Sequence, residues 1–164
     1  MKKIGIVMGS DSDLPIVQKA IDTLTAFEVP FEVHVYSAHR TPAEAKAFSA
    51  NARENDFGAI IAVAGMAAHL AGAVAANTTL PVIGIPVGSK NFGGMDALLS
   101  TVQMPSGIPV ATVAVDGGAN AALLAIQILA VEDASLAQKL DMSRAEGAKK
   151  VLEKNKAIEE RFNG

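Results

Sequence analysis

The chain contains three short polar clusters whose side chains could bind a small molecule and move a proton. They are residues 9–13 (GSDSD), 37–40 (SAHR) and 65–69 (GMAAH), and each directly follows an apolar run. Together they hold hydroxyls, carboxylates, one arginine and two histidines. In an open parallel α/β sheet, the carboxyl ends of the strands line one crevice, where ligands bind. The spacing therefore predicts one site at one edge of a sheet.

The first cluster has the composition of a ribose phosphate site. Backbone N–H groups at a helix start attract anions, and the hydroxyls of Ser10 and Ser12 can donate to phosphate oxygens. The carboxylates of Asp11 and Asp13 can accept from ribose hydroxyls. The alternative interpretation is a helix cap with a solvated turn, since Ser12 or Asp13 can cap a helix that starts at Leu14. The sequence has neither a Gly-x-x-x-x-Gly-Lys-Ser/Thr element nor a Gly-x-Gly-x-x-Gly turn, which disfavours ATP and dinucleotides.

The second cluster places an anion clamp beside an acid/base group. Arg40 offers a planar donor fork that matches phosphate or carboxylate, and Ser37 adds a hydroxyl. His39 can give and take a proton near neutral pH. The alternative is a surface loop that precedes the helix start at Pro42. His34 lies inside the preceding apolar run, and we interpret it as structural.

The third cluster combines small residues with one imidazole. Small side chains at Gly65 and Ala67 allow a ligand close to the backbone, and the following helix supplies another positive end. His69 taken alone fits equally well as a packed or capping histidine. Two strand-end histidines without a third suitably spaced ligand do not predict a metal site. A glycine-rich loop at residues 88–94 could close over a ligand.

The elements that must position these clusters alternate between strand and helix five times. Short apolar runs predict buried strands, and 3.6-residue periodicity or proline at a first turn predicts the helices. The expected strands are residues 4–8, 31–36, 58–64, 81–86 and 109–115, and the expected helices are residues 14–27, 42–55, 67–77, 96–103 and 121–131. This alternation predicts a three-layer α/β/α sandwich with a central parallel sheet, for which we expect the flavodoxin-like strand order.

The rest of the chain reads as a charged helical tail. We expect residues 1–164 to form a single domain, with an α/β core at about 3–132 and a C-terminal helical tail at 133–164. The tail is helical in composition, and Gly147 could divide it into two segments.

Composition excludes several classes of function. The chain has no cysteine, which excludes thiolate nucleophiles, disulfides, cysteine–zinc sites and iron–sulfur clusters. A net charge of −3 without a basic block argues against a nucleic-acid partner. Residues 58–89 carry no Asp, Glu, Lys or Arg, but glycines, prolines and His69 interrupt them, which argues against a membrane span. The apolar run after the N-terminus is too short for a signal peptide, so we expect a cytoplasmic protein.

The middle of the chain is poor in charge, which predicts a homo-oligomer. Between residues 58 and 131 the only charged residues are Lys90, Asp96 and Asp116. The cores of subunit interfaces are depleted in charge, so some helices are expected to face other subunits rather than water. The alternative is an Ala-rich core within one chain.

Several motifs, taken together and in order, resemble one family. Residues 9–13, 37–42, 67–70, 100–110 and 120–125 look like the corresponding segments of the class I 5-(carboxyamino)imidazole ribonucleotide mutases of purine biosynthesis. The resemblance runs from about residue 3 to residue 140. The chain departs from it in having Met66 where many members have glycine, and in a shorter segment around Asp116.

The resemblance implies an isomerase that moves a carboxylate between two positions of one ribonucleotide. Its substrate and product would be 5-(carboxyamino)imidazole ribonucleotide and 4-carboxy-5-aminoimidazole ribonucleotide, without a metal or organic cofactor, in a homo-octamer. His39 would shuttle the proton, Ser10, Asp13 and Arg40 would bind the ribose phosphate, and residues 65–70 would line a carbon dioxide pocket. The substrate-binding candidates are Ser10, Ser12, Asp13, Ser37, Arg40, Gly65, Ala67, His69 and Leu70.

Three other functions remain alternatives. A sister branch of the family carboxylates aminoimidazole ribonucleotide directly with carbon dioxide, whereas the Arg40-Thr41-Pro42 continuation resembles the mutase branch. A flavin- or nucleotide-binding module without catalysis is disfavoured by an aromatic content of 4%. A phospho-receiver domain predicts an aspartate at the end of the third strand, where Ala64 and Gly65 stand.

Overall fold

The computed structural model describes residues 1–163 and contains one five-stranded sheet. Its strands are β1 (Lys3–Met8), β2 (Phe31–Val35), β3 (Phe57–Gly65), β4 (Val82–Val87) and β5 (Ala111–Thr112). They are all parallel and lie in the order β2-β1-β3-β4-β5. This is the flavodoxin-like order, so the predicted fold class is confirmed.

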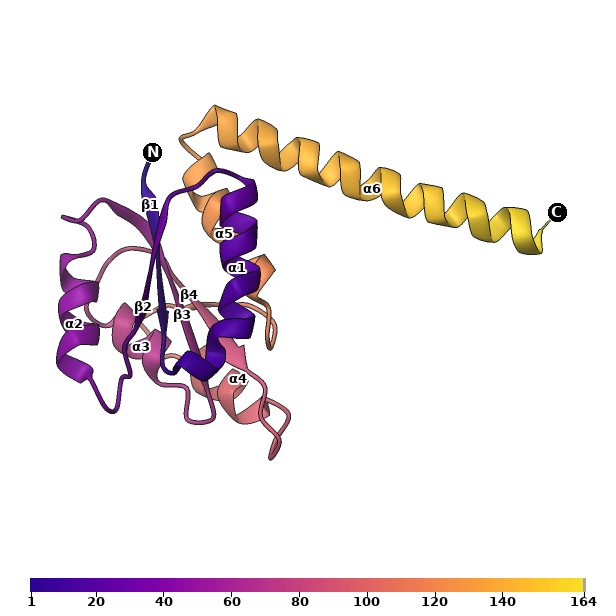
Figure 1. Ribbon diagram of the computed structural model, residues 1–164. Helices are drawn as coiled ribbons and strands as arrows, with labels where there is room; N and C mark the ends of the chain where they lie inside the picture. The colour runs from indigo at the N-terminus through magenta and orange to yellow at the C-terminus, as the bar shows by residue number, and fades with distance from the viewer. Residues whose placement is uncertain (164) are drawn as a thin grey trace.

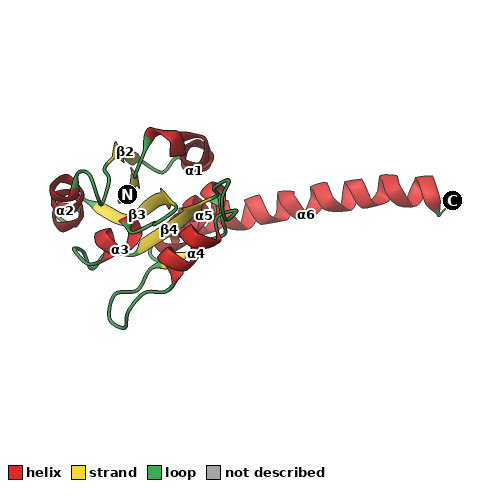
Figure 2. Cartoon of the chain, turned by 90° about the horizontal axis from the view of Figure 1, so that it is seen from below, coloured by secondary structure: helices red, strands yellow, loops and turns green. Residues whose placement is uncertain are grey.

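Helices cover both faces of the sheet (Figure 1). In chain order they are η1 (Asp11–Asp13), α1 (Leu14–Ala26), α2 (Pro42–Asn51), α3 (Leu70–Ala75), α4 (Met95–Val102), α5 (Gly118–Ala130) and α6 (Ala134–Phe162). Figure 2 shows α1 on one side of β3 and β4, with α3 and α4 on the other. Successive strand side chains point to opposite faces, so the two layers bury two separate apolar clusters.

The first cluster lies between the sheet and helices α1 and α5. It contains Ile4 and Ile6 of β1, which are fully buried, with Val17 of α1 and Ile126 of α5. The two helices approach closely at Gly118, where a Cβ atom would lie 2.2 Å from the backbone oxygen of Ile16. Only glycine fits this crossing, and it sets how near α5 lies to α1.

The second cluster lies between the other sheet face and helices α2 and α3. Val7, Ile60 and Ala62 of the strands meet Ala45 of α2 and Leu70 of α3. Continuous apolar strands thus supply both cores, as expected for a parallel sheet with two covered faces. The arrangement holds the carboxyl ends of β1, β2, β3 and β4 along one edge.

Several predicted elements differ from the observed ones, among them α2, which ends at Asn51 rather than residue 55, and α5, which begins at Gly118 rather than residue 121. The fifth strand is only Ala111–Thr112, because β5 is an edge strand that pairs with β4 over two residues. The third predicted helix begins at Leu70 rather than residue 67, because residues 66–69 form tight turns. The tail is one helix, Ala134–Phe162, and Gly147 does not divide it. A single glycine costs a helix only about 1 kcal/mol, which the flanking turns tolerate.

Helix α6 leaves the body of the protein after its first two turns (Figure 1). The Asp133 side chain caps it by accepting from the Leu136 backbone N–H at 3.0 Å, and Leu136 is its one buried residue. Lys139 ties this first part to the C-terminal end of α1, where it donates to the Phe27 carbonyl at 3.2 Å and pairs with Glu28. Beyond Leu140 the helix has no packed face. Within residues 1–163, no helix is both long and apolar enough to cross a membrane.

Candidate active site

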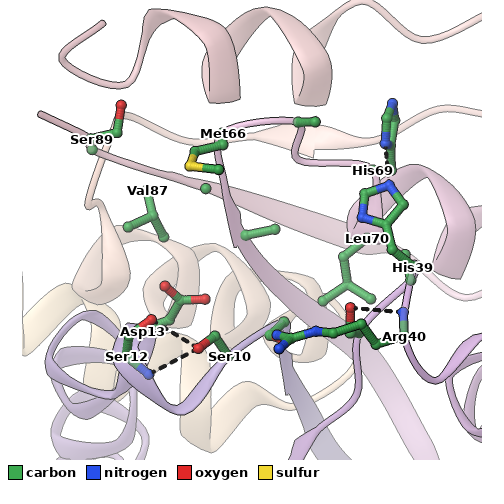
Figure 3. A pocket seen from close by; sticks show the side chains of 17 residues that line it. Ser10, Ser12, Asp13, His39, Arg40, Met66, His69, Leu70, Val87 and Ser89 are labelled. Atoms are coloured by element: carbon green, nitrogen blue, oxygen red, sulfur yellow. Dashed lines mark hydrogen bonds between the residues drawn. The ribbon is translucent and has the colours of Figure 1, made fainter. Parts of the chain in front are cut away.

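The carboxyl edge of the sheet holds a cavity of about 700 Å³ (Figure 3). The loops that follow β1, β2, β3 and β4 all contribute to its wall. The structure therefore brings the three polar clusters of the sequence together, and every predicted site residue lines this cavity. They are Ser10, Ser12, Asp13, Ser37, His39, Arg40, Gly65, Ala67, His69 and Leu70.

The loop after β1 is organised by Ser10. The Ser10 Oγ accepts from the Ser12 backbone N–H at 3.3 Å and from the Ser12 hydroxyl at 2.9 Å. Asp13 occupies the N-cap position of α1, one of the two positions predicted for it, but its side chain makes no cap bond there, and Ser10 caps the 3-10 turn Asp11–Asp13 that precedes the helix. Because Asp13 also ends the 3-10 turn, its backbone angles (φ −84°, ψ −5°) are helical rather than the extended ones typical of a capping residue, and its carboxyl lies at the cavity wall.

Asp13 is a buried carboxyl group at this wall. Asp13 is only 7% exposed. Burial raises the pKa of Asp13 above its ordinary value, and the nearby charges of Asp11 and Asp116 raise it further, while a hydrogen bond from the Ser10 backbone opposes the shift. A carboxylate that lacks full solvation is suited to accept hydrogen bonds from ligand hydroxyls, which would replace the lost water.

We predict that Asp13→Asn stabilises the free protein at neutral pH. In the window above the unfolded pKa and below the raised folded pKa, the folded state binds the proton more tightly, so wild-type stability falls as pH rises. Asparagine does not ionise and escapes this loss. Urea unfolding at pH 7 and at a pH below the unfolded pKa should show a gap between variant and wild type that is larger at pH 7. A gap that is larger at the acid pH would contradict the assignment.

Arg40 links the loop after β2 to the end of β1. One guanidinium N–H donates to the Gly9 carbonyl at 3.2 Å, and the Arg40 backbone N–H donates to the Ser37 hydroxyl at 3.2 Å. The Thr41 hydroxyl accepts from the Ser37 N–H at 2.8 Å and closes the turn. The bond to Gly9 uses one of the five N–H donors of the Arg40 guanidinium and fixes its orientation. The other donors remain available to an anion.

His39 and His69 form a direct pair at the wall of the cavity. His39 Nε2 lies 2.7 Å from His69 Nδ1, and the two rings meet edge to face at 84° with centroids 4.9 Å apart. One N–H must lie between these nitrogens, donated by one ring and accepted by the other. The remaining nitrogen of each ring is outside this bond. The pair can therefore hold a proton at either ring and exchange it.

His34 has the structural role that the sequence predicted for it. Its Nε2 lies 3.5 Å from a Glu32 carboxylate oxygen, and its ring stacks on Tyr36 with centroids 5.1 Å apart. It does not line the cavity.

The loop after β3 contains two backbone hydrogen bonds that each link residues only two positions apart. The Ala68 N–H donates to the Met66 carbonyl at 2.9 Å, and the His69 N–H donates to the Ala67 carbonyl at 2.8 Å. Met66 adopts a φ of +52°, in the left-handed region that turns the chain sharply after the strand. This tight path brings His69 toward His39 and anchors Leu70 in the core beneath the cavity.

Four residues near the cavity were missed or left without a role in the sequence analysis. Val87, the last residue of β4, lines the cavity together with Gly88 and Ser89, which belong to the glycine-rich loop that was expected to close over a ligand. Asp116 accepts from the Gly88 N–H at 2.9 Å and adds its charge to the surroundings of Asp13. The signal for Asp116 was its place as the first polar residue after the fifth apolar run.

The site residues do not form a metal-binding cluster. No group of three or more His, Cys, Asp or Glu side chains in residues 1–163 is arranged to hold a metal ion. A second cavity of about 750 Å³ lies at the opposite, amino end of the strands, where Lys2, Arg53, Asp56 and Glu132 line it together with apolar residues. No histidine among the described residues lines this second cavity.

Comparison with known proteins agrees with this geometry. Residues 3–150 match the family described as AIR carboxylase. The chain is 52% identical over 157 residues to the N5-carboxyaminoimidazole ribonucleotide mutase of Pyrococcus horikoshii, covering 96% of this chain and 89% of the relative. It is 52% identical over 159 residues to the mutase of the same name from Methanocaldococcus jannaschii, covering 97% and 99% of the two chains.

Solved structures point the same way. The crystal structure of Treponema denticola PurE superposes with a TM-score of 0.85 at 29% identity, covering 94% of this chain and 97% of the other. On its sequence and its fold, the chain belongs to the AIR carboxylase family.

Proposed function

We propose that this chain interconverts 5-(carboxyamino)imidazole ribonucleotide and 4-carboxy-5-aminoimidazole ribonucleotide, an isomerisation in purine biosynthesis. The observation that carries the proposal is a single cavity with anion-binding groups at one end and a histidine pair at another (Figure 3). The names of the relatives, at 52% identity over nearly the whole chain, specify the substrate.

The polar end of the cavity fits the ribose phosphate. Arg40, already oriented by Gly9, supplies positive charge and fixed donors, and the serines of the first loop supply hydroxyls. Asp13 then accepts from the ribose hydroxyls. Interactions with this remote part of the substrate do not change during the reaction, so their binding energy serves to position the imidazole ring near His39.

The reaction needs one proton donated and one accepted. Cleavage of the bond between the exocyclic nitrogen and the carboxylate carbon releases carbon dioxide, and the electron pair stays on the nitrogen, which takes a proton from His39. The ring carbon then attacks carbon dioxide to form the new carbon–carbon bond and loses its own proton to His39. The His39 side chain ends in its starting protonation state, so the reaction needs no net supply of protons. His69, 2.7 Å from His39, orients the ring and can share the proton.

An ultraviolet assay tests this proposal directly. Purified protein is mixed with 5-(carboxyamino)imidazole ribonucleotide without ATP, and formation of the carbon-carboxylated product is followed by its absorbance. We expect turnover that scales with protein concentration. Conversion of aminoimidazole ribonucleotide plus bicarbonate, with no conversion of the carboxyamino compound, would instead assign the direct carboxylase activity that the family description also allows.

We further propose that the protein is cytoplasmic and that it forms the homo-octamer that the family resemblance implies. Two exposed apolar stripes support assembly from identical chains. On and before α4, Phe92, Met95, Leu99 and Val102 are 47–70% exposed at helical spacing. On α6, a line of residues repeats every eleven positions, which is close to three full helical turns. It consists of residues 136, 140, 147, 151, 158 and 162. The line is buried at Leu136 and exposed beyond Leu140.

The line on α6 favours a second copy of this chain as its partner. A helix that projects from the body without packing gains little stability from its own hydrogen bonds, so it requires a partner surface. Its free part carries six positive and five negative side chains, which makes it almost neutral and compatible with an identical, weakly acidic chain.

We predict that Val151→Glu combined with Ile158→Glu abolishes the large assembly. Two charges on the apolar line would be buried without partners in the interface, which is strongly unfavourable. Light scattering after gel filtration should give about 135 kDa for eight wild-type copies of 16.9 kDa and a much smaller mass for the variant. The control, Lys149→Gln with Lys156→Gln, makes the same change in net charge on the opposite face and should keep the wild-type mass. Equal masses for all three proteins would remove α6 from the interface.

A further inference from the structure

Asp116 holds the end of β4 through both its backbone and its side chain. The pairing between β4 and β5 extends only to Gly84. Beyond that point, the Asp116 backbone N–H donates to the Pro86 carbonyl at 2.9 Å, and the Asp116 carboxylate accepts from the Gly88 N–H at 2.9 Å. These two bonds flank Val87, so the last residue of β4 is fixed on the side where β5 has already ended.

The Asp116 carboxylate takes the place of a backbone carbonyl. Along a parallel ladder, a residue donates through its N–H and accepts through its carbonyl. The Asp116 carbonyl instead accepts from the Gly118 N–H at 2.9 Å, because the chain turns into α5 with a φ of +59° at Asp116. Aspartate is one of the few residues other than glycine that are enriched in this left-handed region. The side chain therefore completes a ladder that the backbone has left.

The local sequence is suited to this bond. A Cβ atom at Gly88 would lie 3.1 Å from the second carboxylate oxygen of Asp116, so a larger residue there would crowd the carboxylate. The segment around Asp116 is also where the chain is shorter than many members of its family. A shorter turn leaves less backbone to cover the end of β4, and the carboxylate covers it instead.

The end of β4 and the residues after it form the side of the cavity opposite the histidine pair. Val87, Gly88 and Ser89 all line the cavity. Figure 3 shows Val87 and Ser89 on one side of the space and the two histidines on the other. A ring bound between the two sides is confined by this wall and by His39. The position of the wall therefore limits the distance between the ring and the imidazole of His39.

We propose that Asp116 is a positioning residue, which fixes Gly88 and so keeps this wall where it holds the substrate ring against His39. This inference rests on the proposed mutase function, in which His39 must reach both the exocyclic nitrogen and a ring carbon. The proposed phosphate-binding groups, Ser10 and Arg40, lie on other loops. Displacement of the wall should therefore slow bound substrate more than it weakens binding. Misplacement of reacting groups by about 1 Å can cost about 10²-fold in rate.

Three substitutions separate the hydrogen bond of Asp116 from its charge and its backbone angle. Asp116→Asn keeps an oxygen that can accept from the Gly88 N–H but removes the charge, which contributes to the raised pKa of Asp13. Asp116→Gly removes both and adopts a positive φ without strain, whereas Asp116→Ala removes both and keeps the strain. We expect kcat to be about ten- to a hundredfold below wild type for Asp116→Gly and Asp116→Ala, and close to wild type for Asp116→Asn. The dissociation constant of the product, measured by calorimetry, should be nearly unchanged in all three.

Thr78→Ala is the matched control for loss of a bond to the backbone. The Thr78 hydroxyl accepts from the Leu80 N–H at 3.2 Å, shortly before the other end of β4, and Thr78 does not line the cavity. This variant should keep wild-type kcat. Melting temperatures of all the variants show how much of any change in rate accompanies a general loss of stability.

Hydrogen exchange measures the same bond without turnover. In a peptide covering residues 86–90, the Gly88 amide should exchange faster in Asp116→Gly and Asp116→Ala than in wild type, and at the wild-type rate in Asp116→Asn. Wild-type kcat in Asp116→Gly would overturn the proposal. A loss of kcat in Asp116→Asn as large as in Asp116→Gly would also overturn it, because the effect would then belong to the charge. If the wild-type protein makes no product, the proposed function fails instead, and faster exchange in Asp116→Gly would still show that the carboxylate holds Gly88.

Discussion

Replacement of His39 by asparagine should abolish turnover while leaving substrate binding nearly intact. Asparagine can donate and accept hydrogen bonds, but it cannot carry a proton between the exocyclic nitrogen and the ring carbon. Removal of a positioned acid/base group costs about 10²- to 10⁴-fold in rate, and here one group serves both proton transfers. We therefore expect kcat to fall to the upper end of that range or beyond.

The measurement compares kcat from the ultraviolet assay with a dissociation constant from calorimetry. His34→Asn is the matched control, because it makes the same chemical change in a histidine that stacks on Tyr36 outside the cavity. It should keep wild-type kcat. A near-wild-type rate for His39→Asn would show that another group moves the proton, and His69, 2.7 Å away, would be the first candidate.

Replacement of Arg40 by alanine should weaken substrate binding far more than it slows bound substrate. The Arg40 guanidinium donates to the Gly9 carbonyl and lines the cavity, so alanine removes a fixed cation from the proposed phosphate end. Hydrogen bonds to charged groups contribute about 1.5–3 kcal/mol each. Loss of one such bond predicts a rise in KM of about ten- to a hundredfold, and loss of a bidentate pair predicts more.

The effect of Arg40 on affinity is measured most directly in a protein that binds its ligand but does not turn it over. The dissociation constant of the product is measured in the His39→Asn protein with and without Arg40→Ala, so that KM and affinity are not confused. Arg53→Ala is the matched control, since Arg53 bonds to Thr79 at 2.9 Å and lines the cavity at the opposite end of the strands. An unchanged affinity in the Arg40 variant would remove Arg40 from the phosphate site.

Local sequence determined most of the scaffold. The apolar runs that became β1, β3 and β4 are continuous, because both faces of a central parallel strand are buried. Pro15 and Pro42 lie in the first turns of α1 and α2, where the missing N–H is not needed. Each of these patterns depends on only a few neighbouring residues, so it predicts a strand or a helix start without knowledge of the fold.

Elements that depend on neighbours were the ones predicted poorly. Strand β5 has two residues instead of the predicted seven, because its length is set by pairing with β4 at the edge of the sheet and not by its own apolar run. The cap at Ser10 appeared because a 3-10 turn separates β1 from α1. The continuity of α6 past Gly147 reflects the balance between one glycine and many good helix formers.

By itself, the sequence determined which chemical groups the site contains: hydroxyls, one arginine, a carboxyl and two imidazoles, each at the end of a strand. Only the tertiary structure decided how they act on one another. The hydrogen bond between His39 and His69 and the one between Gly88 and Asp116 each join residues 28 or more positions apart. The burial that raises the pKa of Asp13 also depends on surroundings that distant segments create. Residue type and strand ends are local properties, whereas proton sharing and desolvation depend on distances that exist only once the sheet has formed.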